Sequence, residues 1–137
     1  MNNKKLRHAV AELLKSVTLN GAPLFDSESV YPCHLSRINE GDNLPVACVY
    51  VDGGEVESLH SIDQDEVTLI IQVYDIAKLN IDDRLDEFLI SIRQAIKANH
   101  TLGGSVDELL LNKYEYDKDD SSSLGTLTLI LNATFET

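Results

Sequence analysis

The side chains that most readily bind metals are sparse in this sequence and poorly spaced for a shared site. The four histidines are spread over the chain, at His8, His34, His60 and His100. Cys33 lies directly before His34, but neighbouring side chains on a strand point to opposite faces of the sheet. A zinc ion needs its ligands to converge on one point. We therefore expect no metal site, and interpret these residues as surface histidines and a small buried cysteine.

Acidic clusters suggest cation binding, but their spacing fits ordinary surface roles better. Counting from Asp117, a calcium loop needs glycine where Ser122 stands and a bidentate glutamate where Thr128 stands. A solvated hairpin turn after Asp117 is the simpler interpretation. A second cluster consists of Asp82, Asp83, Asp86 and Glu87. Magnesium binding is conceivable there, but acids also suit the first turns and the solvated face of a helix, and we favour that interpretation.

Sequence signatures of common catalytic and cofactor sites are missing. There is no Gly-x-Ser-x-Gly elbow and no phosphate-binding loop. The pairs Gly53-Gly54 and Gly103-Gly104 lack the further glycines of a dinucleotide fingerprint. No nucleophile, base and oxyanion donor are placed to meet. We therefore expect a protein without catalytic residues, metal or cofactor, which is not an enzyme.

Two segments have the apolar periodicity of amphipathic helices. The first stripe comprises Leu6, Val10, Leu13, Leu14 and Val17. The second comprises Ile81, Leu85, Phe88, Leu89, Ile92 and Ile96. We expect the first helix to stop at Asn20-Gly21, because glycine adopts the left-handed conformation of a helix end without strain. We expect Asn80 to cap the second helix, which should run to Asn99.

Alternating and β-branched runs predict the strands. They are expected at 44–51, 67–74 and 126–135, with a further strand around 114–117 and a short one near 30–38. Ser105 followed by Glu108 has the spacing of a capping box, which predicts one short helical turn through Leu110.

These elements predict an α+β fold in a single domain, residues 1–137. We expect a mixed, mostly antiparallel β-sheet of about four to five strands, with the two long amphipathic helices packed on one face. The core should combine the apolar sides of the helices and strands. Its predicted members are Leu13, Leu14, Val17, Leu85, Phe88, Leu89, Ile92, Leu69, Ile71, Leu127 and Leu129.

Composition limits the class of protein further. The 137 residues are 43% hydrophobic and carry a formal charge of −12, from 23 acidic and 11 basic residues. The apolar content is that of a folded protein, and the charge disfavours ordinary nucleic-acid binding. No apolar run approaches the roughly 20 residues that cross a bilayer, and the first residues do not form a signal peptide pattern. With its two cysteines, the chain is expected to be a soluble, acidic, intracellular protein.

One predicted surface departs from this composition. The second faces of the strands 67–74 and 126–135 contain no Lys, Arg, Asp or Glu, although 25% of the chain is charged. A sheet face left to water usually carries some charge, so we expect part of this one to be covered by another subunit. The predicted interface residues are Thr68, Ile70, Gln72, Thr128, Ile130 and Asn132. A threonine-rich but solvated face is the alternative.

The order of these elements resembles that of a known phage protein. The similar segments are Leu6 to Val10, Leu44 to Tyr50, Val73-Tyr74 and the helix after it, Tyr114 to Asp120, and the final strand. Together they resemble the tail terminator proteins of long-tailed phages, the group called minor tail protein U. The stretches 22–38 and 101–111 have no counterpart in the resemblance.

The resemblance implies a structural α+β subunit of a phage or prophage, without catalytic residues. Such subunits form a homo-oligomeric ring, a hexamer, on the head-proximal end of a finished tail. There the ring stops polymerisation of the tail tube and provides the head-joining surface. The implied location is the host cytoplasm during assembly and then the virion tail.

The implied partners are further copies of the chain, the tail tube protein and a head-completion or connector protein. Neither a membrane nor specific nucleic-acid binding is implied, although DNA passes through such a ring. The acidic balance of the chain is compatible with this passage, because a wall of like charge does not hold DNA.

The connection 52–66 is the most acidic part of the chain and contains no Lys or Arg. It is too long for a two-residue hairpin turn and too poor in apolar residues to pack by itself, so we expect a loop. In a ring this loop would face the tube or the lumen. The predicted contact residues are Asp52, Glu55, Glu57, Asp63 and Asp65. A solvated loop without a partner is the alternative.

The alternative function is a stand-alone acidic binding protein, such as a DNA mimic or an inhibitor of a basic enzyme. Mass in solution separates the two functions, because a mimic needs only a monomer or a dimer. A small metal-dependent nuclease built on the helix acids is a third interpretation, which requires an activity that chelation abolishes.

Overall fold

The computed structural model describes residues 1–36, 43–77, 79–119 and 123–137. The elements follow one another in the order α1 (Asn3–Ser16), β1 (Thr18–Leu19), β2 (Ala22–Pro23), the 3₁₀ turn η1 (Ser27–Ser29), β3 (Val30–Tyr31), β4 (Val46–Leu59), β5 (Ile62–Ile76), α2 (Ile81–Ala98), β6 (Glu108–Asp119) and β7 (Leu124–Glu136). Within these residues, no helix is long and apolar enough to cross a membrane.

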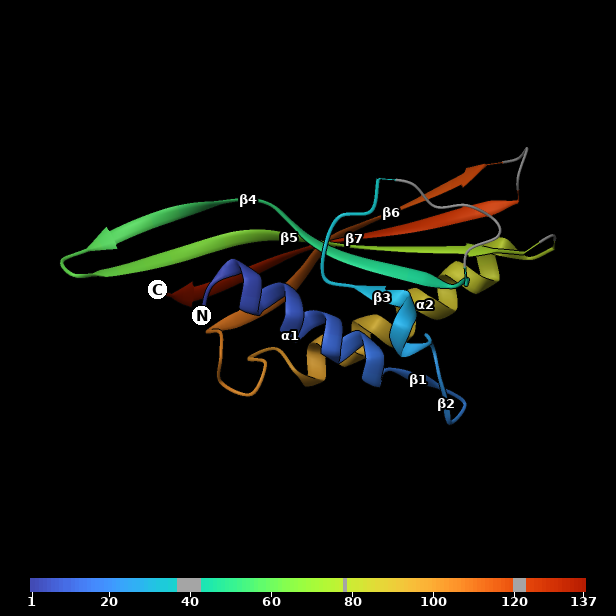
Figure 1. Ribbon diagram of the computed structural model, residues 1–137, viewed down its shortest axis with the longest axis horizontal. Helices are drawn as coiled ribbons and strands as arrows, with labels where there is room; N and C mark the ends of the chain where they lie inside the picture. Colours follow the sequence, from blue (N-terminus) through green and yellow to red (C-terminus); the bar gives the residue numbers. More distant parts are fainter. Residues whose placement is uncertain (37–42, 78, 120–122) are drawn as a thin grey trace.

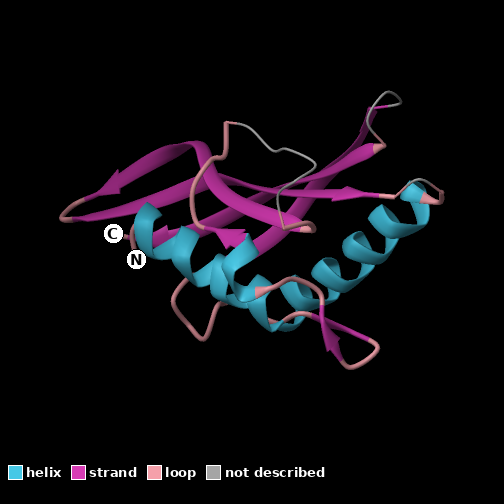
Figure 2. Ribbon diagram, turned by 45° about the vertical axis from the view of Figure 1, so that its right-hand side comes forward, coloured by secondary structure: helices cyan, strands magenta, loops and turns pink. Residues whose placement is uncertain are grey.

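Five strands form one mixed sheet in the order β3-β4-β5-β7-β6. The short β3 runs parallel to β4, and the other neighbours are antiparallel. Both helices lie against the same face of this sheet (Figure 1; Figure 2). We call this the inner face, and the opposite one the outer face. The predicted α+β fold, with two long helices on one face of a mostly antiparallel sheet, is therefore confirmed.

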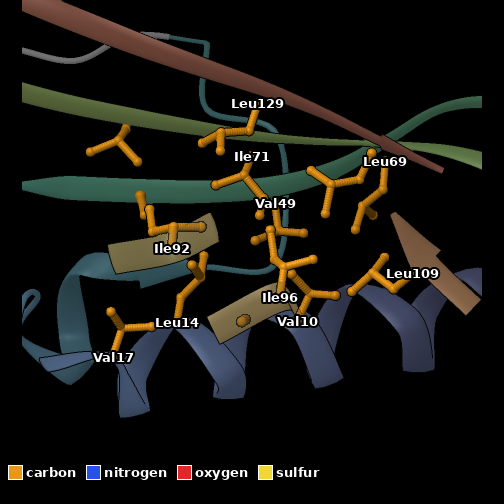
Figure 3. Close-up of a cluster of buried hydrophobic side chains, with 14 of the residues drawn as sticks. Val10, Leu14, Val17, Val49, Leu69, Ile71, Ile92, Ile96, Leu109 and Leu129 are labelled. Atoms are coloured by element: carbon orange, nitrogen blue, oxygen red, sulfur yellow. The ribbon is translucent and has the colours of Figure 1, made fainter. Parts of the chain in front are cut away.

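A single hydrophobic core fills the space between the inner face and the helices. The alternating residues Leu69 and Ile71 of β5 and Leu127 and Leu129 of β7 have no exposed surface. Figure 3 shows side chains of both helices pointing toward these strands. Of the predicted core residues, all but Leu13 are buried, and Leu13 is half-buried on the flank of α1. Burying each large side chain contributes roughly 1.5–3 kcal/mol to folding.

Helix α1 begins where the sequence allows a cap and ends earlier than predicted. The side chain of Asn2 accepts a hydrogen bond from the backbone N–H of Lys5 at 2.8 Å, which satisfies one of the free donors of the first turn. The helix ends at Ser16, so the expectation that Asn20-Gly21 stops it was wrong. Both residues have positive φ and instead form the tight turn between β1 and β2.

Helix α2 has the predicted bounds, and the predicted Asn80 is its N-cap residue. Its φ is 64° and its side chain makes no capping hydrogen bond, so the predicted position of the cap is confirmed and a side-chain cap is not present. Asp82 and Asp83 lie in the first turn, where the helix dipole favours acids. Arg84 reaches back to the buried carboxylate of Asp75 at the end of β5, at 2.5 and 3.0 Å. This ion pair holds the first turns of α2 on the sheet.

Two predicted elements differ from the structure. The helical turn expected from Ser105 to Leu110 was wrong, because Glu108 already belongs to β6 and Leu109 pairs with Ala133 of β7. Pairing with a long neighbouring strand satisfies more backbone groups than one isolated turn of helix does. The strand expected near 30–38 is confined to Val30–Tyr31. Residues 37 and 38 of that prediction, and residues 120–122 of the predicted turn after Asp117, lie outside the described residues.

Candidate interaction surfaces

The acidic segment 52–66 is a β-hairpin arm, so the prediction of a long loop was wrong. Strands β4 and β5 stay paired from Val46↔Tyr74 to Leu59↔Ile62, with one bulge at Asp52, and they turn at residues 60–61. Pairing of β7 with β5 continues as far as Gln64↔Glu136. Figure 1 shows this hairpin projecting beyond the helices. A third strand therefore supports the acidic segment almost to its tip, and the sequence pattern gave no sign of that support.

The hairpin geometry divides the predicted acidic residues between two faces of the arm. Alternation along the paired strands places Glu55 and Glu57 on the outer face, in line with Leu59 and Ile62 at the tip. The opposite face carries Val56, Asp63 and Asp65. Asp52 lies at the bulge where the arm begins. The five predicted contact residues therefore cannot all meet one partner surface.

The predicted interface residues form three direct cross-strand pairs at the centre of the sheet. The pairs are Thr68↔Asn132, Ile70↔Ile130 and Gln72↔Thr128, all on the outer face. Ile70 is buried and the other five are half-buried. The predicted common face of these two strands is thus confirmed. It forms an uncharged stripe that we call the central stripe.

The strands on the two sides of the central stripe, β4 and β6, have different surroundings on the outer face. Over β4 the segment after β3 covers the sheet, where the ring of His34 meets the edge of Tyr50 at 4.8 Å between centroids. Cys48 is completely buried there, and this burial raises the pKa of its thiol. On the other side, edge strand β6 carries an exposed ion pair between Lys113 and Glu115, with 2.9 Å between nitrogen and oxygen.

A polar hollow of about 370 Å³ lies on the outer face where the arm joins the body. Its lining includes Thr68 and Asn132 of the central stripe together with Asp52, Glu55 and Glu66. Asn132 donates a hydrogen bond to Glu66 at 3.4 Å. The hollow therefore connects the two surfaces that the sequence assigned to separate roles.

A second hollow, which the sequence analysis missed, lies between the end of α2 and the start of β6. It measures about 320 Å³, and we call it the α2–β6 groove. Ile96 and Leu109–Leu111 supply its apolar lining, Arg93, Lys97 and His100 supply its basic lining, and Glu108 is the one acid among the lining residues. The available signal was two bases four residues apart on a helix, followed twelve residues later by a Leu-Leu-Leu run. Leu109 and Leu110 of that run were assigned to a helical turn, so the groove was not predicted.

Within the described part of the chain, the residue types that commonly bind metals lie apart from one another. All four histidines are exposed, which confirms the interpretation of surface histidines. Cys33, beside His34, is exposed too, so its interpretation as a small buried cysteine was wrong; the buried cysteine is Cys48. Among the described residues, no group of three or more potential ligands is arranged to hold a metal ion. Of the helix acids, Asp82 pairs with Lys118 at 2.7 Å and Asp86 accepts a hydrogen bond from Tyr116. These two acids therefore link α2 to β6.

The architecture is similar to that of a virion protein. A chain from the virion of a native gene transfer agent (GTA) particle aligns with a TM-score of 0.54 and 14% sequence identity. The alignment covers 96% of this chain and 95% of that one. At such low identity the likeness concerns the fold. None of the curated proteins compared with the chain is significantly similar to it in sequence.

The sequence itself matches a family model. The model describes phage minor tail protein U and matches residues 1–135 of the 137. The match includes both helices, the arm, the groove and all of the sheet except Glu136, the last residue of β7. It thus confirms the resemblance that the order of elements suggested, and the chain belongs to the phage minor tail protein U family, whose members are structural proteins of the phage tail.

Proposed function

We propose that this protein is a tail terminator, which assembles into a hexameric ring on the head-proximal end of the tail tube. The ring stops tube polymerisation and offers the surface that the head joins. The observation that carries this proposal is the family match over residues 1–135. The proposed partners are other copies of the chain, the tail tube protein and a head-completion protein. The proposed role is structural rather than catalytic.

The shape of the subunit supports a ring. A closed ring with one kind of contact needs two different surfaces on each subunit, because the contact is heterologous. This chain has a projecting arm, an uncharged central stripe and a groove, and each is formed by different residues. The net charge of −12 also suits a passage for DNA, because like charge prevents adhesion to the wall.

The decisive experiment compares tails made with and without this protein. Phage particles lacking the gene should contain tubes of abnormal length and no joined heads, and expression of the protein in trans should restore normal tails. Purified protein added to polymerising tube protein should stop growth and appear as a cap by electron microscopy. Normal, infectious tails in the absence of the protein would overturn the proposal.

The strongly acidic composition also fits one alternative function, that of a stand-alone acidic binding protein of the DNA-mimic type. Such a protein would remain a monomer or dimer at every concentration and would inhibit a basic, DNA-binding enzyme. Native mass spectrometry separates the two functions, because a ring component reaches about six subunits under assembling conditions.

A further inference from the structure

We propose that the tip of the arm of one copy docks into the α2–β6 groove of a second copy. This inference rests on the proposed ring and specifies the contact that builds it. The tip residues are Leu59, Ile62 and Glu57, and the receiving residues are Arg93, Lys97 and the apolar groove lining.

The tip of the arm has the composition of a docking element. Leu59 and Ile62 face each other across the two strands and are 55% and 49% exposed. Large apolar side chains paired at the end of a projecting hairpin are costly to leave in water. Glu57 follows on the same face, two residue pairs further down the arm, where it is opposite Gln64. The tip thus presents an apolar end backed by a negative charge.

The α2–β6 groove has the complementary composition. Leu110, which is 48% exposed, and Leu111 contribute apolar surface, while Arg93 and Lys97 lie on the exposed side of α2. Neither base forms an ion pair within the described part of the chain, whereas Lys15, Arg84, Lys113 and Lys118 each do. With Glu108 as the one acid among the lining residues, the two bases leave the groove with an excess of positive charge, which suits an occupant that is apolar and acidic.

Charge selects the arm as that occupant. Segment 52–66 contains acids and no Lys or Arg, in a chain with a formal charge of −12. Two copies of so acidic a protein repel each other, so a stable contact is favoured where bases such as Arg93 and Lys97 of one copy meet acids of the other. In the arm, Glu57 lies directly behind the apolar tip and can reach the basic lining when the tip is seated.

The two surfaces cannot meet within one copy. The arm extends from one side of β7, through β5, whereas β6 and the groove lie on its other side. At the level of Thr134, β7 pairs with Glu66 of the arm and with Glu108 of β6. The tip lies beyond this level, and Figure 1 shows it pointing away from the body. The contact is therefore heterologous, which is the kind that closes a ring.

This contact separates the acids of the arm by role. Glu57 belongs to the contact between copies rather than to the surface facing the tube or the lumen. Asp63 and Asp65, on the opposite face of the arm, remain available for that second role.

The test compares two substitutions of an apolar residue by aspartate, one on each face of the arm. Leu59→Asp should weaken self-association at least about tenfold, because it places a charge in the apolar contact. Val56→Asp introduces the same charge on the opposite face, at a side chain that is 62% exposed, and should leave the mass distribution unchanged. Light scattering over a concentration series measures the self-association of both variants, and circular dichroism verifies that both are folded.

A second set of variants tests the α2–β6 groove, which receives the arm in the proposed contact. Arg93→Glu/Lys97→Glu should weaken assembly, whereas the charge-matched control Lys4→Glu/Lys5→Glu on exposed positions of α1 should not. A mixture of the Leu59→Asp protein with the groove variant retains one intact arm and one intact groove, so it should give a one-to-one dimer that grows no further. Glu57→Lys should weaken assembly, and combination with Lys97→Glu should restore it.

The outcomes distinguish this inference from the proposed function. If wild-type protein forms rings and the Leu59→Asp protein forms them equally well, or if Val56→Asp is equally disruptive, the arm does not dock in the groove and the ring stands. If wild-type protein stays monomeric at every concentration and does not cap tubes, both the ring and its arm contact are wrong.

Discussion

The guanidinium group of Arg84 lies 2.5 Å from the carboxylate of Asp75, which is 4% exposed, and thereby joins the start of α2 to the end of β5. Arg84→Ala would leave this buried carboxylate without its cation, so we expect the free energy of unfolding to fall by about 2 to 4 kcal/mol. Urea denaturation measures the loss. Lys15→Ala, which removes an exposed pair with Glu12, should cost less than about 0.5 kcal/mol. Equal losses in the two variants would contradict a structural role of the buried pair.

Phe88 is the largest side chain that α2 contributes to the core. It is 1% exposed and stacks on Phe25 with 5.5 Å between ring centroids. Phe88→Ala should lower the free energy of unfolding by about 3 to 5 kcal/mol, because it leaves a cavity between helix and sheet. Ile90→Ala, on the exposed side of the same helix, should change it by less than about 0.5 kcal/mol. A wild-type melting temperature for the Phe88 variant would refute this placement.

Ionisation of Tyr74 should lower the free energy of unfolding at alkaline pH. Burial raises the pKa of Tyr74 to about 12 from its ordinary value near 10, and its hydroxyl donates a hydrogen bond to Gln72 at 2.8 Å. Because the unfolded chain releases this proton at lower pH than the folded one, the stabilisation is complete below pH 10 and is lost as pH rises toward 12. Urea midpoints across this range should fall less steeply for Tyr74→Phe than for the wild type. Identical slopes would show that Tyr74 does not contribute to the loss.

The central stripe on the outer face is expected to take part in the ring contact together with the arm. Ile130→Asp should shift the protein toward smaller species without unfolding it, because the side chain points away from the core. The same apolar-to-acid change at Leu79, which is 83% exposed outside the stripe, serves as the control. Light scattering that finds the wild-type oligomer for the Ile130 variant would exclude the stripe from the interface.

Asp63 and Asp65 are expected to face the tube or the lumen. The substitutions Asp63→Lys and Asp65→Lys should leave the assembled mass unchanged, because these residues lie on the face of the arm opposite Leu59 and Ile62. They should impair capping or DNA passage, because they reverse the charge of the surface presented there. Tail length by electron microscopy and infectivity of the particles are the two readouts. Full infectivity with tails of normal length would mean that this face of the arm has no partner.

The sequence alone determined the elements whose signals are local. Apolar residues three and four positions apart defined α1 and α2, and alternation defined the centres of β5 and β7 with their buried residues Leu69 and Leu129. Fold class followed, because two apolar helix stripes need one apolar sheet face to cover. The order of elements also led to the family that the match over residues 1–135 confirms.

The tertiary structure alone decided the surfaces that depend on residues distant in sequence. The arm was predicted as a loop, because nothing between 52 and 66 reveals that Gln64 pairs with Glu136. The groove went unnoticed because Lys97 and Leu111 belong to different elements, and the strand that carries Leu111 was predicted as a helical turn in part. Local propensity is encoded in neighbouring residues, whereas strand pairing is a free-energy balance over the whole sheet. That balance turned an acidic connection into a supported arm and placed an apolar, basic groove on another side of the same subunit.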